Sequence, residues 1–138
     1  MDCLFCAIVA GDHPAHRVLD TDDAVGFLDA RPVFKGHVLV VPRVHYETLG
    51  DLPTQLVAPI FESVQRVSRA VVSAYDAQGS FVAANNVISQ SVPHLHVHVV
   101  PRRRKDGLRG FFWPRTKYAD DEEAADYAER LRAVLSDA

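Results

Sequence analysis

The chain has 138 residues, 48% of them apolar and 24% charged, which is typical of an ordinary globular domain. Its formal net charge of −3 argues against bulk electrostatic binding to nucleic acid or to an anionic membrane. A length of 138 residues is ordinary for one domain, which we expect to span residues 1–138. No segment approaches the roughly 20 apolar residues of a membrane span, and the start MDCLFCAIVAGD lacks the basic region of a signal peptide, so we expect the protein to be cytoplasmic.

The first half of the chain predicts three strands. Short strands are expected at Arg17–Leu19 and Ala24–Leu28, joined by the polar stretch DTDD. The apolar run Val38–Val41, between a glycine and a proline, predicts a buried strand.

The middle of the chain predicts one long helix. Residues 54–75 carry apolar side chains at helical spacing, which predicts a single buried stripe made of Val57, Ile60, Phe61, Val64, Val67 and Val71. Pro59 lies inside this pattern, so we expect the first turn to be separate or kinked. Gly79 ends the segment, and Ser80–Asn85 predicts a fourth strand.

Residues 94–100, HLHVHVV, alternate strictly between histidine and apolar residues until the final pair. This period predicts a half-buried strand with His94, His96 and His98 on one face, and we expect Pro101 to close it. A second helix is predicted over Asp120–Leu135, with acidic residues at its start. Together the elements predict an α+β fold: about five antiparallel strands, one long helix and a C-terminal helix, with helices on one sheet face and histidines on the other.

The three histidines are compatible with two kinds of chemistry. They could be metal ligands, or one imidazole could be a nucleophile that its neighbours orient. The upstream loop supplies uncharged donors suited to phosphoryl oxygens, namely Asn85, Asn86, Ser89, Gln90 and Ser91. Downstream lies a basic stretch that could attract an anionic substrate or be merely solvated: Arg102, Arg103, Arg104, Lys105, Arg109 and Arg115.

Two cysteines in a CxxC pair open the chain. In a cytoplasmic protein, Cys3 and Cys6 are expected to be thiols or metal ligands rather than a disulfide. With His45 and one histidine of the triplet they would make a tetrahedral Cys₂His₂ set.

These segments resemble the histidine triad family of nucleotidyl hydrolases and transferases. The family signature is His-φ-His-φ-His-φ-φ, with φ apolar, and HLHVHVV fits it at every position. The resemblance extends in family order over roughly residues 3–114, through CLFCAI, FLDARPVFKGHVLVVPRVH, NN…QSVPHLHVHVVPR and the tryptophan–proline pair. It implies cleavage at the α-phosphate of a purine nucleoside phosphate derivative, of the phosphoramidate or dinucleoside polyphosphate type.

The resemblance also implies roles for individual residues. His96 matches the nucleophile that forms a covalent nucleotidyl-histidine, and His98 and His37 match the positions that flank and orient it. Other matches are phosphate contacts at Gln90 and Ser91, a ribose contact at Asp29, and the apolar base pocket at Phe27 and Leu28. Ser91, His98 or water would handle the proton of the leaving group.

In the zinc-containing branch of the family, the positions of Cys3, Cys6, His45 and His94 bind the metal, so the resemblance implies a structural zinc ion. It also implies a homodimer with an extended sheet. The loop NNVISQ departs from the family's glycine-containing type NNG…AGQ, and we favour Asn85 as the phosphate-contacting asparagine. Two alternatives stay open: a metalloenzyme whose catalytic ion is held by the histidine triplet, and a nucleotide-binding module with little catalytic activity.

Overall fold

The computed structural model describes residues 2–108 and 114–136. The chain divides into two compact units, Met1–Asp106 and Gly107–Ala138. The expectation of a single domain over residues 1–138 stays a prediction. No helix in the described ranges is both long enough and apolar enough to cross a membrane.

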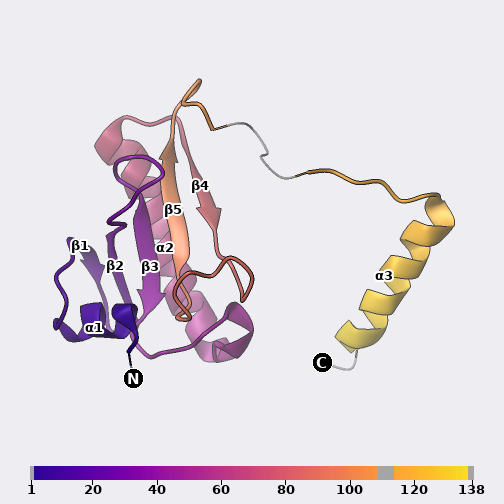
Figure 1. Ribbon diagram of the computed structural model, residues 1–138, viewed down its shortest axis with the longest axis horizontal. Coiled ribbons are helices and arrows are strands. Elements are labelled where there is room, and N and C mark those ends of the chain that lie inside the picture. The colour runs from indigo at the N-terminus through magenta and orange to yellow at the C-terminus, as the bar shows by residue number, and fades with distance from the viewer. Residues whose placement is uncertain (1, 109–113, 137–138) are drawn as a thin grey trace. The chain divides into compact units, whose positions relative to one another are not determined.

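The first unit is built on a five-stranded antiparallel sheet with the strand order β1-β2-β3-β5-β4 (Figure 1). Its strands are β1 Arg17–Asp20, β2 Ala24–Leu28, β3 Val38–Pro42, β4 Gly79–Ala83 and β5 Val97–Arg102. A short helix α1 (Leu4–Ala10) precedes the sheet, and the 3₁₀ turn η1 (Leu49–Asp51) and the long helix α2 (Thr54–Tyr75) connect β3 to β4. The predicted α+β class and the antiparallel sheet are confirmed.

The two faces of the sheet carry separate apolar cores. On one face, α2 packs on alternate residues of the central strands; this core includes Val38, Val40, Ile60, Val64, Val67, Val71, Leu95, Val97 and Val99. On the other face, α1 packs against the intervening residues; this smaller core includes Phe5, Ile8, Val25, Phe27, Leu39 and Val41. The period of two along β3 and β5 therefore leaves His98 on the α1 side, because its neighbours Val97 and Val99 face α2.

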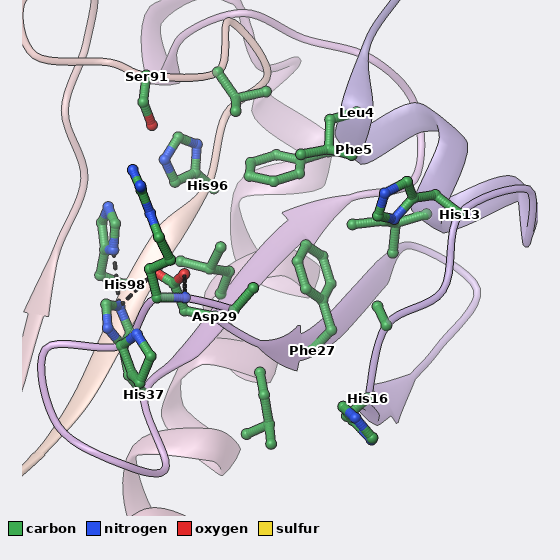
Figure 2. Close-up of a pocket in the computed structure, with 18 of the residues that line it drawn as sticks. Leu4, Phe5, His13, His16, Phe27, Asp29, His37, Ser91, His96 and His98 are labelled. Carbon is green, nitrogen blue, oxygen red and sulfur yellow. Dashed lines mark hydrogen bonds and ion pairs between the residues drawn. The ribbon is translucent and has the colours of Figure 1, made fainter.

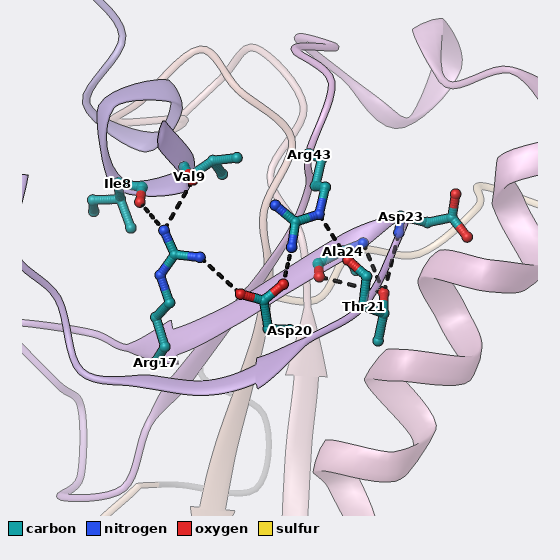
Figure 3. Close-up of polar contacts among 8 residues, drawn as sticks. All are labelled: Ile8, Val9, Arg17, Asp20, Thr21, Asp23, Ala24 and Arg43. Carbon is teal, nitrogen blue, oxygen red and sulfur yellow. Dashed lines mark hydrogen bonds and ion pairs between the residues drawn. The ribbon is translucent and has the colours of Figure 1, made fainter. Parts of the chain in front are cut away.

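Helix α1, which sequence patterning did not predict, is fixed at both ends. The Cys3 sulfur caps its first turn by accepting from the backbone N–H of Cys6, and Gly11 ends it in a left-handed conformation. Figure 3 shows the Arg17 guanidinium donating to the backbone carbonyls of Ile8 and Val9 and to the carboxylate of Asp20. Carbonyls at the end of α1 that have no partner within the helix are thus satisfied, and the helix is tied to β1.

Three of the predicted elements differ in detail from the structure. Helix α2 runs unbroken through Pro59, and Val57 and Phe61 are 39% and 37% exposed, so the buried stripe is narrower than expected. The fourth strand ends at Ala83, and the histidine strand begins only at Val97. It also continues past Pro101 to Arg102, because the pairing with β3 ends at Val99 and Pro101 lies where only β4 remains as a neighbour.

In the second unit, helix α3 spans Asp121–Ser136 and has no buried residue. The Asp120 carboxylate accepts from the backbone N–H of Glu123, whose own carboxylate accepts from the N–H of Ala119. This reciprocal cap, together with the acidic first turn, explains why the helix begins where the acidic run predicts. Arg109 and Trp113 lie outside the described residues.

Candidate functional site

A cavity of about 850 Å³ opens on the α1 side of the sheet. Its walls come from α1, from β2 and the loop that follows it, and from the segment around the histidine triplet (Figure 2). Of the residues expected at the site, the lining includes Phe27, Leu28, Asp29, His37, Ser91, His96 and His98. Residues as far apart in the sequence as Leu4 and His98 thus meet in one pocket.

The orientation of the His96 ring follows from one hydrogen bond. Its Nδ1 lies 2.8 Å from the backbone carbonyl oxygen of His94. A carbonyl only accepts, so Nδ1 carries the proton and Nε2 carries the lone pair. The His96 residue as a whole is only 3% exposed. Among the described residues, however, every side-chain nitrogen or oxygen that is fully buried has a hydrogen-bond partner. Nε2 has no partner in those residues, so it is open to the cavity.

His37 and His98 form a second chain of hydrogen bonds. The backbone N–H of Val33 donates to Nδ1 of His37 at 3.1 Å, so the neutral His37 ring holds its proton on Nε2. That nitrogen lies 2.9 Å from Nδ1 of His98 and 3.7 Å from Oδ2 of Asp29. His37 therefore donates to His98, whose own proton is left on Nε2.

Both of these rings are neutral at physiological pH. Burial lowers the pKa of His98 to about 4, and the neighbouring His96 and His37 add to the effect. Burial also lowers the pKa of His37, although the nearby Asp29 acts in the opposite direction. The site thus presents a neutral His98 ring with a free N–H beside the His96 ring, whose hydrogen bond to the His94 carbonyl leaves the lone pair on Nε2.

The apolar end of the cavity comes largely from α1, which sequence reasoning did not assign to the site. The Phe5 ring packs edge-on against Phe27 with centroids 5.4 Å apart, and against His96 at 5.0 Å. Leu4 and Ile8 complete this wall, and His13 and His16 lie at its outer end (Figure 2). The apolar residues around the CxxC pair were the available signal.

Several expected residues do not line the cavity. The Gln90 side chain donates to the backbone carbonyl of Glu47 and accepts from Val87, and the Asn85 amide donates to the carbonyl of Ser89. In the downstream basic stretch, Arg102 is paired with Asp106 at 2.6 Å, and Arg103 donates to the carbonyl of Tyr75. Of the basic residues expected to form a positive rim, Arg102, Arg103, Arg104 and Lys105 therefore do not line this cavity, and Arg109 lies outside the described residues. The phosphate contacts expected of Asn85 and Gln90 stay predictions.

The loop that carries Asn85 is strained. Val87 and Ser89 have φ angles of 70° and 61°, in the left-handed region that glycine adopts most readily. The loop therefore takes up a glycine-like backbone conformation without containing glycine.

Behind the triplet, four potential metal ligands converge: Cys3, Cys6, His45 and His94. Nδ1 of His94 lies 3.4 Å from the Cys3 sulfur, 3.5 Å from the Cys6 sulfur and 3.1 Å from Nδ1 of His45, and the Cys6 sulfur lies 3.3 Å from Nδ1 of His45. A tetrahedral zinc ion with ordinary bond lengths separates its nitrogen ligands by about 3.3 Å and a nitrogen from a sulfur by about 3.6 Å. The cluster is thus compatible with zinc.

The protonation pattern agrees with this reading. Nε2 of His94 donates to the Pro42 carbonyl at 2.9 Å, which leaves the lone pair on Nδ1, the atom that faces the cluster. Burial and the adjacent Cys3 raise the pKa of the Cys6 thiol, an effect that the charge of a metal ion would offset.

A second set, Asp29, His37 and His98, also brings three potential ligand atoms together. Here the pattern does not fit a metal. Because Nδ1 of His37 accepts from Val33, the nitrogen that faces the set carries a proton and has no lone pair to offer. The three histidines of the triplet also do not face one common point. His94 faces the cysteines, whereas His96 and His98 line the cavity.

Known proteins with similar sequences identify the family of this chain. The HIT domain profile matches residues 10–105. The chain is 34% identical over 109 residues to the adenylylsulfatase HINT3 of Arabidopsis thaliana, covering 78% of this chain and 55% of that protein. It is 32% identical over 124 residues to the adenosine 5′-monophosphoramidase hnt1 of Schizosaccharomyces pombe, covering 88% of this chain and 90% of the relative.

Solved structures agree with the sequence comparison. A HIT family protein from Bacillus subtilis superposes with a TM-score of 0.86 at 33% identity and covers 96% of both chains. A zinc-bound histidine triad family protein from Mycobacterium smegmatis has a TM-score of 0.75 at 38% identity, over 99% of this chain and 97% of that one. The resemblance in the sequence is therefore confirmed, and this chain belongs to the HIT domain family.

Proposed function

We propose that the protein is a nucleotidyl hydrolase or transferase that cleaves purine nucleoside phosphate derivatives at the α-phosphate through a covalent adduct on His96. The observation that carries the proposal is the hydrogen bond from His96 to the His94 carbonyl, which turns the Nε2 lone pair towards the cavity. A neutral imidazole is a good nucleophile near pH 7.

The reaction has two displacements. In the first, Nε2 of His96 bonds to the α-phosphorus, the bond from phosphorus to the leaving group breaks, and the leaving group keeps the electron pair. In the second, water or another acceptor attacks phosphorus and releases its proton to solvent, the P–N bond breaks, and its electron pair returns to Nε2. Throughout, the proton stays on Nδ1 and is donated in a hydrogen bond to the His94 carbonyl, which stabilises the positive ring of the adduct.

The rest of the cavity suits a nucleotide. The purine fits against the apolar wall of Phe5, Ile8, Phe27 and Leu28, and Asp29 is available to accept from the ribose hydroxyls. The Nε2–H of His98 and the hydroxyl of Ser91 face the region of the phosphoryl oxygens, where donors stabilise the transition state. His37 has a positioning role, because its donated proton fixes the tautomer of His98.

A zinc ion held by Cys3, Cys6, His45 and His94 is part of the proposal. Its support is the convergence of four ligand atoms and the free lone pair on Nδ1 of His94. When bound, the ion would supply structural crosslinking between α1 and the segments that carry the two histidines. It takes no part in the displacements.

A two-fold dimer also belongs to the proposal. Strand β4 is at one edge of the sheet, and Val82 on it is 43% exposed. Pairing of β4 with β4 of a second copy would extend the sheet and cover the β4 edge of each copy. A cytoplasmic location is supported by the two free cysteines, whose use as metal ligands requires reduced thiols.

The test is to trap the intermediate. Protein mixed with an adenylyl substrate, quenched in denaturant and analysed by intact mass should gain one adenylyl group, and peptide mapping should locate it on His96. His96→Ala should abolish the adduct and turnover while retaining nucleotide binding. His16→Ala, which removes an exposed histidine from the outer wall, should still form it.

Two outcomes would favour the other candidate functions. Nucleotide binding without adduct or product from any substrate would favour a binding module. Full turnover by His96→Ala, lost on chelation in protein that stays folded, would favour catalysis by a metal ion.

A further inference from the structure

Similarity to the named relatives does not identify the leaving group of the substrate. The name of one relative indicates a sulfate leaving group and that of another an amine, at nearly equal identity. The charges around the cavity distinguish these two chemistries.

Two permanent cations line the cavity, Arg31 and Lys35, and both are exposed. Among the described residues that line the cavity, Asp29 supplies the one carboxylate. In residues 2–108 and 114–136, neither the Arg31 guanidinium nor the Lys35 ammonium has a hydrogen-bond or ion-pair partner. Two cations that lack ion-pair partners, set against one carboxylate, give the lining of the cavity a net positive charge.

The loop that carries these cations is fixed to the reactive groups at both ends. The N–H of Arg31 donates to Oδ1 of Asp29 at 2.9 Å, and the N–H of Asp29 donates to the His37 carbonyl at 2.9 Å. Inside the loop, the N–H of Val33 donates to the His37 ring and that of His37 to the Phe34 carbonyl. The backbone that carries the two cations is therefore fixed next to the segment that holds His37.

The neutral histidines also favour an anionic leaving group. An amine leaves phosphorus only after it gains a proton, whereas sulfate or a nucleoside phosphate leaves as a stable anion and needs positive charge instead. The lowered pKa values of His37 and His98 leave no imidazolium there to donate a proton near pH 7. The cavity is thus better equipped to stabilise an anion than to protonate an amine.

We propose that Arg31 and Lys35 form a subsite for an anionic leaving group, which makes adenylyl sulfate or a dinucleoside polyphosphate, rather than a phosphoramidate, the preferred substrate class. This inference rests on the proposed nucleotidyl transfer to His96. In the first displacement, the bond from the α-phosphorus to the bridging oxygen breaks, the oxygen keeps the electron pair, and the two cations neutralise the charge that develops on the departing group.

The experiment compares kcat/KM for three substrates that share the adenylyl group: adenylyl sulfate, diadenosine triphosphate and adenosine 5′-phosphoramidate. The wild type should favour at least one anionic leaving group over the amine. The double variant Arg31→Gln/Lys35→Gln should lower that ratio by roughly tenfold, about 1.4 kcal/mol at 25 °C. Which of the two anionic substrates loses more identifies whether the subsite serves sulfate or a nucleoside phosphate.

Two variants serve as controls. Arg69→Gln removes an exposed cation from α2, outside this cavity, and should leave the ratio unchanged. Lys35→Arg keeps the charge and should retain most of the preference.

The inference is overturned if the wild type prefers the phosphoramidate, or if the double variant slows all three substrates equally. Absence of turnover and of a His96 adduct with every substrate would instead remove the proposed function itself, and the subsite with it.

Discussion

His94 and His96 are joined by a hydrogen bond from the His96 ring to the His94 backbone carbonyl, 2.8 Å long, while the His94 side chain faces Cys3 and Cys6. One residue thus takes part in both the Cys–His cluster and the orientation of the proposed nucleophile. Anything that loosens His94 is expected to disturb the tautomer and direction of the His96 ring.

Metal content is the first prediction. Purified protein should contain about one zinc ion per chain, and Cys6→Ser should lower this content and the thermal midpoint of unfolding, since the cluster would lose a ligand. Elemental analysis and thermal denaturation measure both. His37→Gln changes the other candidate cluster, whose protonation does not fit a metal, and should keep the zinc. Equal zinc content in Cys6→Ser and wild type would contradict the assignment.

The His98 pKa predicts a pH-dependent stability. Folding lowers this pKa from 6.5 to about 4, so the unfolded chain binds the proton more tightly. The stability contributed by the neutral ring is fully present above pH 6.5 and is lost as the pH falls towards 4. Urea unfolding at pH 7.5 and 4.5 should therefore show the wild type losing more stability than His98→Asn. An identical loss in both proteins would show that His98 titrates normally.

Phe5 is predicted to determine nucleotide affinity. Its ring contacts both Phe27 and His96 and lines the cavity. Phe5→Leu keeps an apolar side chain in place but removes the aromatic face, and should weaken AMP binding roughly fivefold, about 1 kcal/mol. Calorimetric titration measures this. Phe61→Leu, on the α2 face, is the matched control, and an equal effect there would remove Phe5 from the binding site.

The sequence predicted the parts of this molecule whose signals are local and periodic. The continuous apolar run Val38–Val41 and the 3.6-residue period of Thr54–Tyr75 placed β3 and α2 to within one residue, because a strand buried on both faces is apolar throughout and a helix buried on one face is apolar at helical spacing. The alternation of residues 94–100 also explains why the start of β5 was predicted wrongly. Continuing the alternation back to His94 extended the strand beyond the point where β3 and β4 pair with it.

The site was only partly predictable, for a related reason. The triplet signature identified His96 and His98, but which ring nitrogen carries a proton depends on the His94 and Val33 backbone groups, which no pattern reveals. Phe5 was missed because α1 is a seven-residue helix, too short for a helical period to stand out. Among the described residues, Arg31 and Lys35 are the arginine and lysine that line the cavity, whereas Arg102 of the expected basic stretch is paired with Asp106.

The strained loop offers a stabilising substitution. Val87 has φ 70° and is 67% exposed, so it incurs the left-handed penalty of about 1–2 kcal/mol with little burial to offset it. Val87→Gly should raise the free energy of unfolding by about 0.5–1 kcal/mol after the entropic cost of glycine. Val44→Gly, at a 58% exposed position where φ is not positive, should lower it. Chemical denaturation of both variants decides, and destabilisation by Val87→Gly would mean that the loop tolerates its conformation without strain.

Gly36 connects the cation-bearing loop to His37, and its substitution should damage both stability and activity. Its φ is +98°, and a Cβ there would lie 2.4 Å from the Tyr75 ring. Gly11→Ala is the matched control, because its φ of +86° imposes similar backbone strain while nothing lies within 4 Å of the new Cβ. Gly36→Ala should therefore be destabilised more than Gly11→Ala, and the double variant Gly36→Ala/Tyr75→Ala should recover the difference. If the two single variants unfold at the same denaturant concentration, Tyr75 moves aside freely and does not hold the loop in place.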